Sequence, residues 1–525
     1  MAADWNFGDL LDATAAAVPE DRPALIHGDR VVTWGAFDAR TNRLARAMLA
    51  SGLETGTRVA ILARNVPEFV EIAAAAFKAR LTHVNINYRY TTDEIRYVLA
   101  DCTAGALFYQ PEFEATVSSL FDTLPHLVLG VRIGTENYEA LASEGDPTPL
   151  PLQRSPDDGY LLYTGGTTGK PKGVMWRAGD ARAVQLEAPT IKQVPSSLAD
   201  HVAMVAANPL PGRVLPACPM MHGAGLNSAM AELVGGGTVV LLPNDKFVPD
   251  ELWDEVERHA VTRVLIVGDV FARPMAQSLA RHPGHWDLSS MRVISSAGLM
   301  WSREVKHALV EAIPQVTLVD ILGASEASGF GYAVTTATSE TPTGFFEAGK
   351  QTVIIDVETD RVLATDDIGE GWLARGEPFA LGYHGDPDKT AATYRTIAGK
   401  RYAIPGDMAA REPDGRIRLV GRGSQVINTG GEKVFTEEVE EAMKRAPGVE
   451  DAIVIGVPDA TWGKAIVALV TVSAGYDEQA VRTAMLGSLA PYKLPKRIIV
   501  RDELPRHASG KSDYRQALEI AVAAH

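Results

Sequence analysis

The chain has 525 residues, of which 50 are Lys or Arg and 66 are Asp or Glu, so its net charge is −16 with neutral histidines. This charge excludes a generally basic protein that coats nucleic acid, although it says nothing of local basic sites. The only cysteines, Cys102 and Cys218, exclude a disulfide framework and a cysteine-rich zinc or iron–sulfur site. The length allows about three to five domains.

No apolar run reaches the roughly 18 residues that a membrane-spanning helix needs. The candidates, such as residues 72–77 and 264–267, are short and flanked by charge. Residues 1–20 are acidic and lack the basic region and apolar core of a secretory signal. We therefore expect a soluble cytoplasmic protein with no transmembrane segment.

The first three hundred or so residues read as alternating helices and strands. Helices are expected at residues 36–50, 68–80, 253–259 and 276–281, and at a segment that Ser302 can cap and that ends before Pro314. Strands are expected at residues 58–63, 264–267, 291–294 and 316–322. This alternation predicts parallel βαβ units whose ligands bind at the carboxyl ends of the strands.

The pattern changes after about Arg422. Thr436 can cap a helix that runs to Arg445 and is stopped by Pro447 and Gly448. Strands are expected at residues 452–456, 466–472 and 497–500, and helices at 477–489 and 512–523. We therefore predict an α/β fold with a large N-terminal body of βαβ subdomains, residues 1–422, and a smaller α+β domain, residues 423–525.

The strongest local signal is residues 163–174, YTGGTTGKPKGV. Its glycines let backbone N–H groups approach an anion, its threonines add hydroxyl donors, and Lys170 and Lys172 add positive charge. It is not a Walker A loop, because that motif needs glycine at position 164 and Ser or Thr at position 171. The segment predicts a polyphosphate site. Its expected contacts are Thr164, Gly165, Gly166, Thr167, Thr168, Gly169 and Lys172.

Together with further segments in order, this loop resembles the motifs of the adenylate-forming superfamily, which contains acyl-CoA synthetases, peptide-synthetase adenylation domains and luciferases. The other segments are residues 218–225, 321–328, 406–407, 421–433 and 504–511. The likeness spans nearly the whole chain. Residues 175–177 and 422–435 look like those of actinobacterial fatty-acid and sterol-side-chain CoA ligases.

The resemblance implies an ATP site. Glu326 would be a catalytic residue that holds Mg²⁺ against the ATP phosphates, with Ser325 in place of the usual threonine. Leu322 stands where the family usually stacks an aromatic residue on adenine. Asp407 would accept hydrogen bonds from the ribose hydroxyls, and Arg422 would donate to ribose or phosphate. The remaining expected nucleotide contacts are Ser296, Ala297, Gly298 and Gly323.

The resemblance also implies an acyl site and a moving C-terminal domain. Lys511 resembles the lysine that enters the active site during adenylation and offsets negative charge in the transition state. His222 is expected to bind or gate the acid, not to transfer a proton, and its neighbours Gly223, Ala224 and Gly225 would line the same site. Rotation at a hinge that contains Ser424 would then bring Gly430, Gly431 and Lys433 to the site for thioester formation with CoA.

The expected function is ATP-dependent ligation of a carboxylic acid to CoA through an acyl-adenylate. The partners would be ATP, CoA and a small acid, with Mg²⁺ as cofactor, no nucleic acid, and a possible homodimer. The small and apolar residues of segment 222–230 favour a fatty or steroid-side-chain acid and leave aromatic acids open. The alternatives are a stand-alone enzyme that loads an acyl or aryl acid onto a carrier protein, luciferase-type oxidation, and a non-catalytic nucleotide-binding module.

Overall fold

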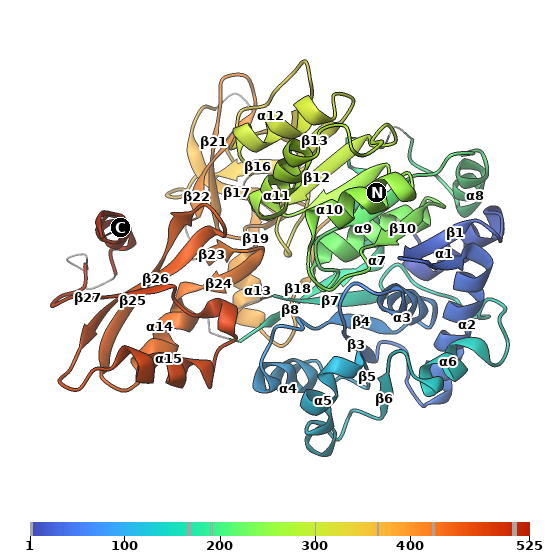
Figure 1. Cartoon of the computed structure of the whole chain (residues 1–525), viewed down its shortest axis with the longest axis horizontal. Helices are drawn as coiled ribbons and strands as arrows, with labels where there is room; N and C mark the ends of the chain where they lie inside the picture. The colour runs from blue at the N-terminus through green and yellow to red at the C-terminus, as the bar shows by residue number, and fades with distance from the viewer. Residues whose placement is uncertain are drawn as a thin grey trace.

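The computed structural model describes residues 4–524 except 165–169, 190, 192, 300, 365–366, 423–425 and 507–511. It has a large body and a smaller lid, which forms the left-hand part of Figure 1. Body and lid each contain hydrophobic clusters of their own. The predicted α/β fold, with a large body and a small C-terminal domain, is confirmed.

One sheet of the body has the strand order β18-β8-β7-β4-β3-β5-β6. Neighbours from β7 to β6 are parallel, whereas β8 and β18 pair antiparallel. The strands are β3 (Arg58–Leu62), β4 (Thr82–Asn85), β5 (Ala106–Tyr109), β6 (Leu129–Arg132), β7 (Gly159–Thr164), β8 (Lys172–Arg177) and β18 (Gly382–Tyr383). The helices of this part are α2 (Trp34–Ala50), α3 (Pro67–Lys78), α4 (Thr92–Asp101), α5 (Glu114–Ser118) and α6 (Glu136–Ser143). The predicted elements at 36–50, 58–63 and 68–80 lie within two residues of α2, β3 and α3.

The second sheet of the body carries the predicted βαβ units. Neighbours are parallel from β1 through β10, β9, β11 and β12 to β13, and β2 and β14 pair antiparallel. The strands are β1 (Pro23–His27), β2 (Arg30–Thr33), β9 (Arg213–Pro216), β10 (Thr238–Leu241), β11 (Arg263–Ile266), β12 (Val293–Ala297), β13 (Thr317–Leu322) and β14 (Gly331–Thr335). The helices are α1 (Phe7–Ala17), α7 (Ala178–Leu186), α8 (Leu198–Ala206), α9 (Gly223–Val234), α10 (Pro249–Arg258), α11 (Gly268–Arg281) and α12 (Arg303–Ala312).

Three predicted boundaries in this part of the body differ from the structure. Helix α10 begins at Pro249, four residues before the predicted start. Helix α11 begins at Gly268, eight residues before the predicted start, and contains Pro274. Proline removes one helical hydrogen bond, but Ala272 and Met275 on either side of it are fully buried in the core. Strand β12 begins at Val293, later than predicted, because Met291 lies buried in the turn that precedes it.

An antiparallel extension, not foreseen from the sequence, continues this sheet beyond β14. Its elements are β15 (Phe345–Ala348), β16 (Thr352–Ile355), β17 (Glu370–Gly376), α13 (Pro387–Thr393), β19 (Tyr394–Ile397), β20 (Lys400–Ala403), β21 (Asp407–Arg411) and β22 (Ile417–Arg422). It places the start of β21 and the end of β22 beside the lid, which begins after β22.

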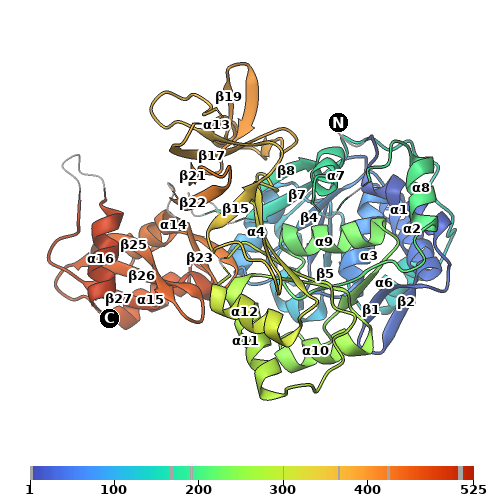
Figure 2. The ribbon, with the colours of Figure 1, turned by 90° about the horizontal axis from the view of Figure 1, so that it is seen from above.

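The lid consists of a hairpin, a three-stranded sheet and helices. Its elements are β23 (Val426–Thr429), β24 (Glu432–Phe435), α14 (Thr436–Lys444), β25 (Val449–Asp459), β26 (Gly463–Val472), α15 (Glu478–Leu486), the 3₁₀ turn η3 (Pro491–Lys493), β27 (Arg497–Val500) and α16 (Tyr514–Ala523). The hairpin β23–β24 lies toward the body, whereas α16 lies at the far edge of the lid (Figures 1 and 2). All the predicted elements of this domain are present.

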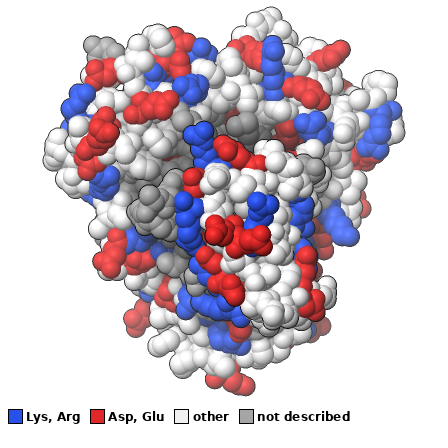
Figure 3. All heavy atoms as spheres, turned by 90° about the vertical axis from the view of Figure 1, so that its left-hand side faces the viewer, with Lys and Arg blue, Asp and Glu red and all other residues white. Residues whose placement is uncertain are grey.

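Charge is mixed on the face that carries the lid. Figure 3 shows acidic and basic side chains interspersed over this face, so the net charge of −16 is not gathered there into one acidic patch. Within the described ranges, no helix is both long enough and apolar enough to cross a membrane.

Candidate active site

The phosphate loop joins two antiparallel strands. Thr164 ends β7 and lies opposite Lys172, which begins β8. The ends of the predicted loop are therefore held side by side. Predictions for Gly165, Gly166, Thr167, Thr168 and Gly169 lie outside the described residues.

Lys172 and Glu326 are connected through one tyrosine. Lys172 Nζ lies 2.7 Å from Asp386 and 5.9 Å from the centre of the Tyr383 ring. The Tyr383 hydroxyl donates to Glu326 Oε1 at 2.8 Å. Burial and the neighbouring Glu326 carboxylate raise the pKa of Tyr383, so this hydroxyl keeps its proton and orients the carboxylate. The structure thus brings the predicted metal ligand close to the base of the phosphate loop.

The donor set around Glu326 fits magnesium held jointly with a substrate. No cluster of three or more His, Cys, Asp or Glu side chains with metal-binding geometry occurs in the part of the chain that the structure describes. Mg²⁺ commonly binds one or two carboxylates and completes its shell with water and substrate phosphates. One oriented carboxylate near the end of a phosphate loop meets that requirement.

The predicted nucleotide wall lies at the carboxyl ends of β12 and β13. Ser296 is buried, and its hydroxyl accepts a hydrogen bond from the Gly268 N–H at 2.8 Å. Its side chain therefore fixes the start of α11, and a contact with nucleotide would fall to the backbone of Ala297 and Gly298. Leu322 ends β13 and packs against the core of the body.

The following segment is held by backbone contacts. The indole of Trp176 donates to the Ser325 carbonyl at 2.8 Å, and Gly323 lies close to Ser328. Asp407 and Arg422 are cross-strand partners in β21 and β22, so the two predicted ribose contacts are brought together in register.

The predicted acyl segment begins helix α9. His222 is its N-cap residue, and Gly223 and Gly225 form its first turn. A Cβ at Gly223 would lie 2.7 Å from Leu162 Cδ1, and a Cβ at Gly225 would lie 2.7 Å from the Pro219 carbonyl oxygen. Glycine at both positions lets α9 pack closely on its neighbours. Ala224 packs against a small apolar cluster that includes Cys218 and Val267.

The lid turn, Gly430 and Gly431, connects β23 and β24 and lies against the body. Gly431 has a φ of +86°, and a Cβ there would lie 3.4 Å from Val267 Cγ1 at the end of β11. Gly430 donates its N–H to the Trp462 carbonyl at 3.0 Å. The lid turn therefore lies against the body at the end of β11, and its role in closing the site remains a prediction.

Glu432, next to the lid turn, is buried among three side chains of the body. Its carboxylate lies 2.5 Å from Arg89 Nη1, 3.1 Å from Asn87 Nδ2 and 3.4 Å from His222 Nε2. Burial acts to raise the pKa of Glu432, but His222 and Arg89 lower it below its usual value. Glu432 is therefore an anion, and it connects the lid to the acyl segment.

Glu432 lies in the predicted hinge motif but was expected to have no role of its own, and Asn87 and Arg89 were not predicted from the sequence. Asn87 and Arg89 lie more than 300 positions before Glu432 in the chain, and no pattern in the sequence links them to it. Lys433 is half-buried, beside Glu432.

The two other predicted lid residues, Ser424 and Lys511, lie outside the described residues. The residues that flank the second gap are described: Arg506 and Ser512 form a β-bridge, and Arg506 pairs with Asp451 of β25.

Comparison with known proteins decides the family. Residues 11–384 match the family described as AMP-binding enzyme, and residues 438–511 match the AMP-binding enzyme C-terminal domain. The chain belongs to the AMP-binding enzyme family. The predicted class of reaction, AMP-forming acid–thiol ligation, is thereby confirmed.

Similar proteins of this family include two mycobacterial ligases. The chain is 38% identical to the medium-chain acyl-CoA ligase Mig of Mycobacterium avium, over 97% of each chain. It is 36% identical to the medium/long-chain-fatty-acid–CoA/3-oxocholest-4-en-26-oate–CoA ligase of Mycobacterium tuberculosis (strain CDC 1551 / Oshkosh), over 99% of this chain and 96% of that one. The structure of the amide bond synthetase McbA from Marinactinospora thermotolerans has the same fold, with a TM-score of 0.80, 24% identity, and coverage of 98% of this chain and 99% of that one.

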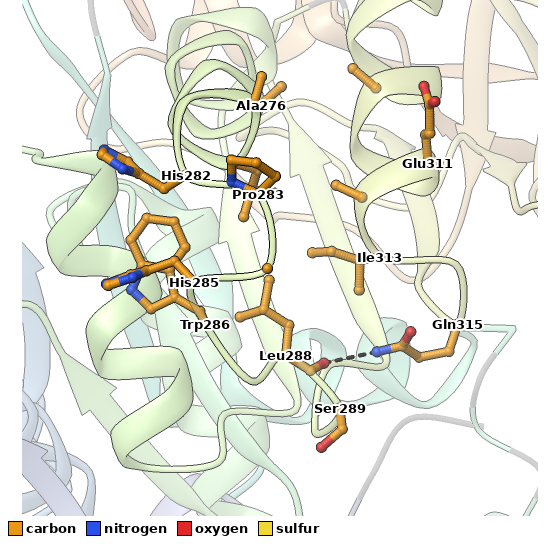
Figure 4. Close-up of a pocket in the computed structure, with 15 residues that line it drawn as sticks. Ala276, His282, Pro283, His285, Trp286, Leu288, Ser289, Glu311, Ile313 and Gln315 are labelled. Atoms are coloured by element: carbon orange, nitrogen blue, oxygen red, sulfur yellow. Dashed lines mark hydrogen bonds between the residues drawn. The ribbon is translucent and has the colours of Figure 1, made fainter.

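Two hollows of this AMP-binding enzyme are lined by none of the predicted site residues. A groove of about 630 Å³ between α11 and α12 is bordered by His282, Trp286 and Glu311 and contains none of the predicted site residues (Figure 4). A smaller cavity of about 220 Å³ is lined by Arg64, Arg89 and Pro219 among others. It adjoins both the acyl segment and the partner of Glu432.

Arg182 of α7 is a cation that the sequence did not single out. It is half-buried and donates to Gln185 Oε1 at 3.1 Å, and Gln185 donates to the Asn227 carbonyl of α9 at 3.4 Å. Burial lowers the pKa of Arg182 to about 10. No carboxylate pairs with it among the residues that the structure describes. A cation therefore lies near the helix that begins with the acyl segment.

Proposed function

We propose that this enzyme joins a medium- or long-chain fatty acid, or a steroid-side-chain acid, to CoA through an acyl-adenylate. The observation that carries the proposal is the contact of the acyl segment with two other parts of the site. Gly223 lies against Leu162 of β7, the strand that leads into the phosphate loop, and His222 lies 3.4 Å from Glu432 beside the lid turn. The names of the two mycobacterial relatives support the choice of acid and acceptor.

The first half-reaction needs charge neutralisation at the ATP phosphates. Lys172 and the backbone of the phosphate loop would bind phosphate oxygens, and Glu326, oriented by Tyr383, would hold Mg²⁺. The ion would supply positive charge against the pyrophosphate oxygens. Asp407 and Arg422 would orient the ribose. Lys511 would act on the α-phosphate, as the family resemblance implies.

The second half-reaction needs a path for a thiol. In the present arrangement Glu432, which follows the lid turn, lies 3.4 Å from His222 Nε2. The pantetheine chain of CoA would pass beside the lid turn to reach the acyl carbonyl. Glu432 holds this arrangement through Arg89. The thiol would lose its proton to solvent, its sulfur would attack the acyl carbonyl, and AMP would leave with the electron pair of the broken anhydride bond.

An exposed tryptophan with a lysine beside its ring, close to the lid turn, supports CoA as the acceptor. Trp462 is 41% exposed, and Lys496 Nζ lies 5.0 Å from the centre of its ring. A stacking surface with a cation beside it suits an adenine with attached phosphates. We therefore place the nucleotide end of CoA at Trp462 and Lys496.

The distal end of the acid would lie toward Arg182. In the described part of the chain the half-buried Arg182 guanidinium pairs with a neutral amide, Gln185, and with no carboxylate, which favours an acceptor oxygen on the ligand. A steroid acid with a ring ketone offers that oxygen at the end remote from its carboxylate, whereas a simple fatty acid does not. The proposal therefore ranks oxidised steroid acids above saturated fatty acids of similar length.

Activity profiling tests this choice. Purified enzyme with ATP, Mg²⁺ and CoA would be given saturated fatty acids of graded length, an oxidised and a deoxygenated steroid-side-chain acid, and aryl acids, with acyl-CoA measured by chromatography. We expect acyl-CoA from the first two groups. AMP release that requires a carrier protein in place of CoA would overturn the proposal. The boundary at residue 422, a cytoplasmic location and a homodimer remain predictions.

A further inference from the structure

A buried lysine of the lid reaches into the body. Lys493 in η3 has no exposed surface, and its Nζ lies 2.6 Å from Glu94 Oε1 and 2.7 Å from Glu438 Oε1. Glu438 belongs to α14 of the lid, whereas Glu94 belongs to α4 of the body. One ammonium group thus joins the two parts of the molecule; we call Lys493, Glu94 and Glu438 the interdomain bridge.

The bridge is shielded from water and has one negative charge too many. The Lys493 ammonium lies 5.3 Å from the ring centre of Tyr90 and 5.8 Å from that of Tyr492, and the side chain has no exposed surface. Glu94 uses its second oxygen to accept the Thr91 N–H at 2.8 Å, but Glu438 Oε2 has no hydrogen-bond partner within the described part of the chain. Two carboxylates share one cation, so the balance of charge is restored by one proton.

The position of the bridge relates it to the lid turn. Asn87 and Arg89 contact Glu432 of the lid, and Glu94 contacts Lys493 of the lid. All three body residues belong to one short segment of the chain. Segment 87–94 of the body therefore contacts two charged side chains of the lid at once. The Glu432 anion lies at one end of the segment and the Lys493 cation at the other. Two separate contacts of this kind fix the rotation of one rigid part against another, whereas one contact leaves it free to swivel.

We propose that Lys493 is a positioning residue for thioester formation, and that the bridge to Glu94 holds the lid with the lid turn beside His222. This rests on the proposed two-step function. Removing one partner of a buried ion pair leaves an uncompensated buried charge, which strongly destabilises the state that buries it. Loss of the bridge would therefore depopulate this lid orientation. It would leave the orientation used for adenylation untouched.

Proton balance makes the bridge sensitive to pH. Burial raises the pKa of Glu438 to about 7, with Lys493 acting against the shift and Glu94 adding to it. The other titratable groups that face it are Tyr90 and Tyr492, whose pKa values burial raises well above the usual range, and both therefore stay neutral. A carboxyl whose pKa is raised by docking takes up a proton when the lid docks. The docked lid is therefore most stable when the pH is below the usual pKa of a glutamate. Its stability then decreases as the pH rises toward about 7.

The body contains a matched control. Lys78 is also fully buried and also lies between two carboxylates, 3.0 Å from Asp12 and 2.5 Å from Asp38. Its partners belong to α1 and α2, so its ion pairs lie within the body. Removing Lys78 therefore tests the loss of a buried lysine without any change at the lid.

Separate assays of the two half-reactions test the proposal. The first is acid-dependent exchange of pyrophosphate into ATP, and the second is acyl-CoA formation from supplied acyl-adenylate and CoA. We expect Lys493→Met and Glu94→Gln to slow the second by about tenfold or more and to leave the first within about twofold. Glu94→Gln is the gentler variant, because glutamine at this position still completes the capping box of α4.

Lys78→Met should not separate the two rates: both should fall together, through instability, or neither should. For Glu438→Gln, the rate of the second half-reaction would be divided by the wild-type rate at each pH, because this ratio cancels the ionisation of the CoA thiol. The ratio should rise as pH increases from 5 toward 8. If Lys493→Met and Glu94→Gln each change the rates of both half-reactions by the same factor, the bridge is not a positioning device. If wild-type enzyme makes no acyl-CoA at all, the proposed function itself fails, and the two failures are therefore distinct.

Discussion

Replacing Glu432 by glutamine should impair only the second half-reaction. The substitution keeps the size of the side chain and an acceptor for Asn87, but it removes the charge that faces Arg89 and His222. A hydrogen bond to a charged group contributes about 1.5–3 kcal/mol. Arg89 is 40% exposed, so solvent screens its share and the lower end of the range applies. A loss of about 1.5 kcal/mol from the docked lid corresponds to a rate about tenfold lower.

The assay is single-turnover formation of acyl-CoA from supplied acyl-adenylate, with pyrophosphate exchange measured in parallel. Glu340→Gln is the matched control, because Glu340 also pairs with an arginine and a histidine, Arg303 and His307, but does so on an exposed surface of the body. We expect the control to leave both rates near those of the wild type. A Glu432→Gln enzyme in which both rates fall equally, or neither falls, would refute the idea that this carboxylate acts through the lid.

Four further substitutions have defined outcomes. Lys511→Ala should abolish acyl-adenylate formation yet spare thioester formation from supplied acyl-adenylate; wild-type adenylation would contradict its role. Tyr383→Phe should raise the Mg²⁺ concentration for half-maximal adenylation about fivefold, since one hydrogen bond to Glu326 is lost, and an unchanged Mg²⁺ titration would argue against that ligand. Trp462→Ala should raise KM for CoA about tenfold without changing KM for ATP; equal shifts in both would remove Trp462 from the CoA site. Arg182→Met should lower kcat/KM for an oxidised steroid acid more than for a saturated fatty acid, and a uniform loss would contradict its contact with the acid.

The fold was predictable where sequence patterns are local. Alanine-rich helices α2 and α3 and the apolar strand β3 follow from composition and period alone. The antiparallel extension was not foreseen, because its strands alternate weakly and pair with distant segments, such as β15 with β22. Register between such segments depends on tertiary packing, which a single sequence does not display.

In the candidate site, too, residues in local motifs were predictable, whereas the partners that folding brings to them were not. Residues inside contiguous motifs, such as Lys172, Glu326 and His222, were found from the sequence. Asp386 and Tyr383, the partners of Lys172 and Glu326, were not found, and neither was Arg89, the partner of Glu432, since a lone tyrosine, aspartate or arginine carries no local signature. The interdomain bridge was equally invisible, because a buried lysine reads in sequence as a solvated one.

The central claim is that one site activates an acid with ATP and transfers it to CoA. Its most direct test is a stoichiometric measurement with purified enzyme, Mg²⁺, ATP, a fatty or steroid-side-chain acid and CoA. The account predicts one AMP and one acyl-CoA for each ATP consumed, and acyl-adenylate that stays on the enzyme when CoA is left out. Acyl-adenylate that forms but is not converted when CoA is supplied would contradict it.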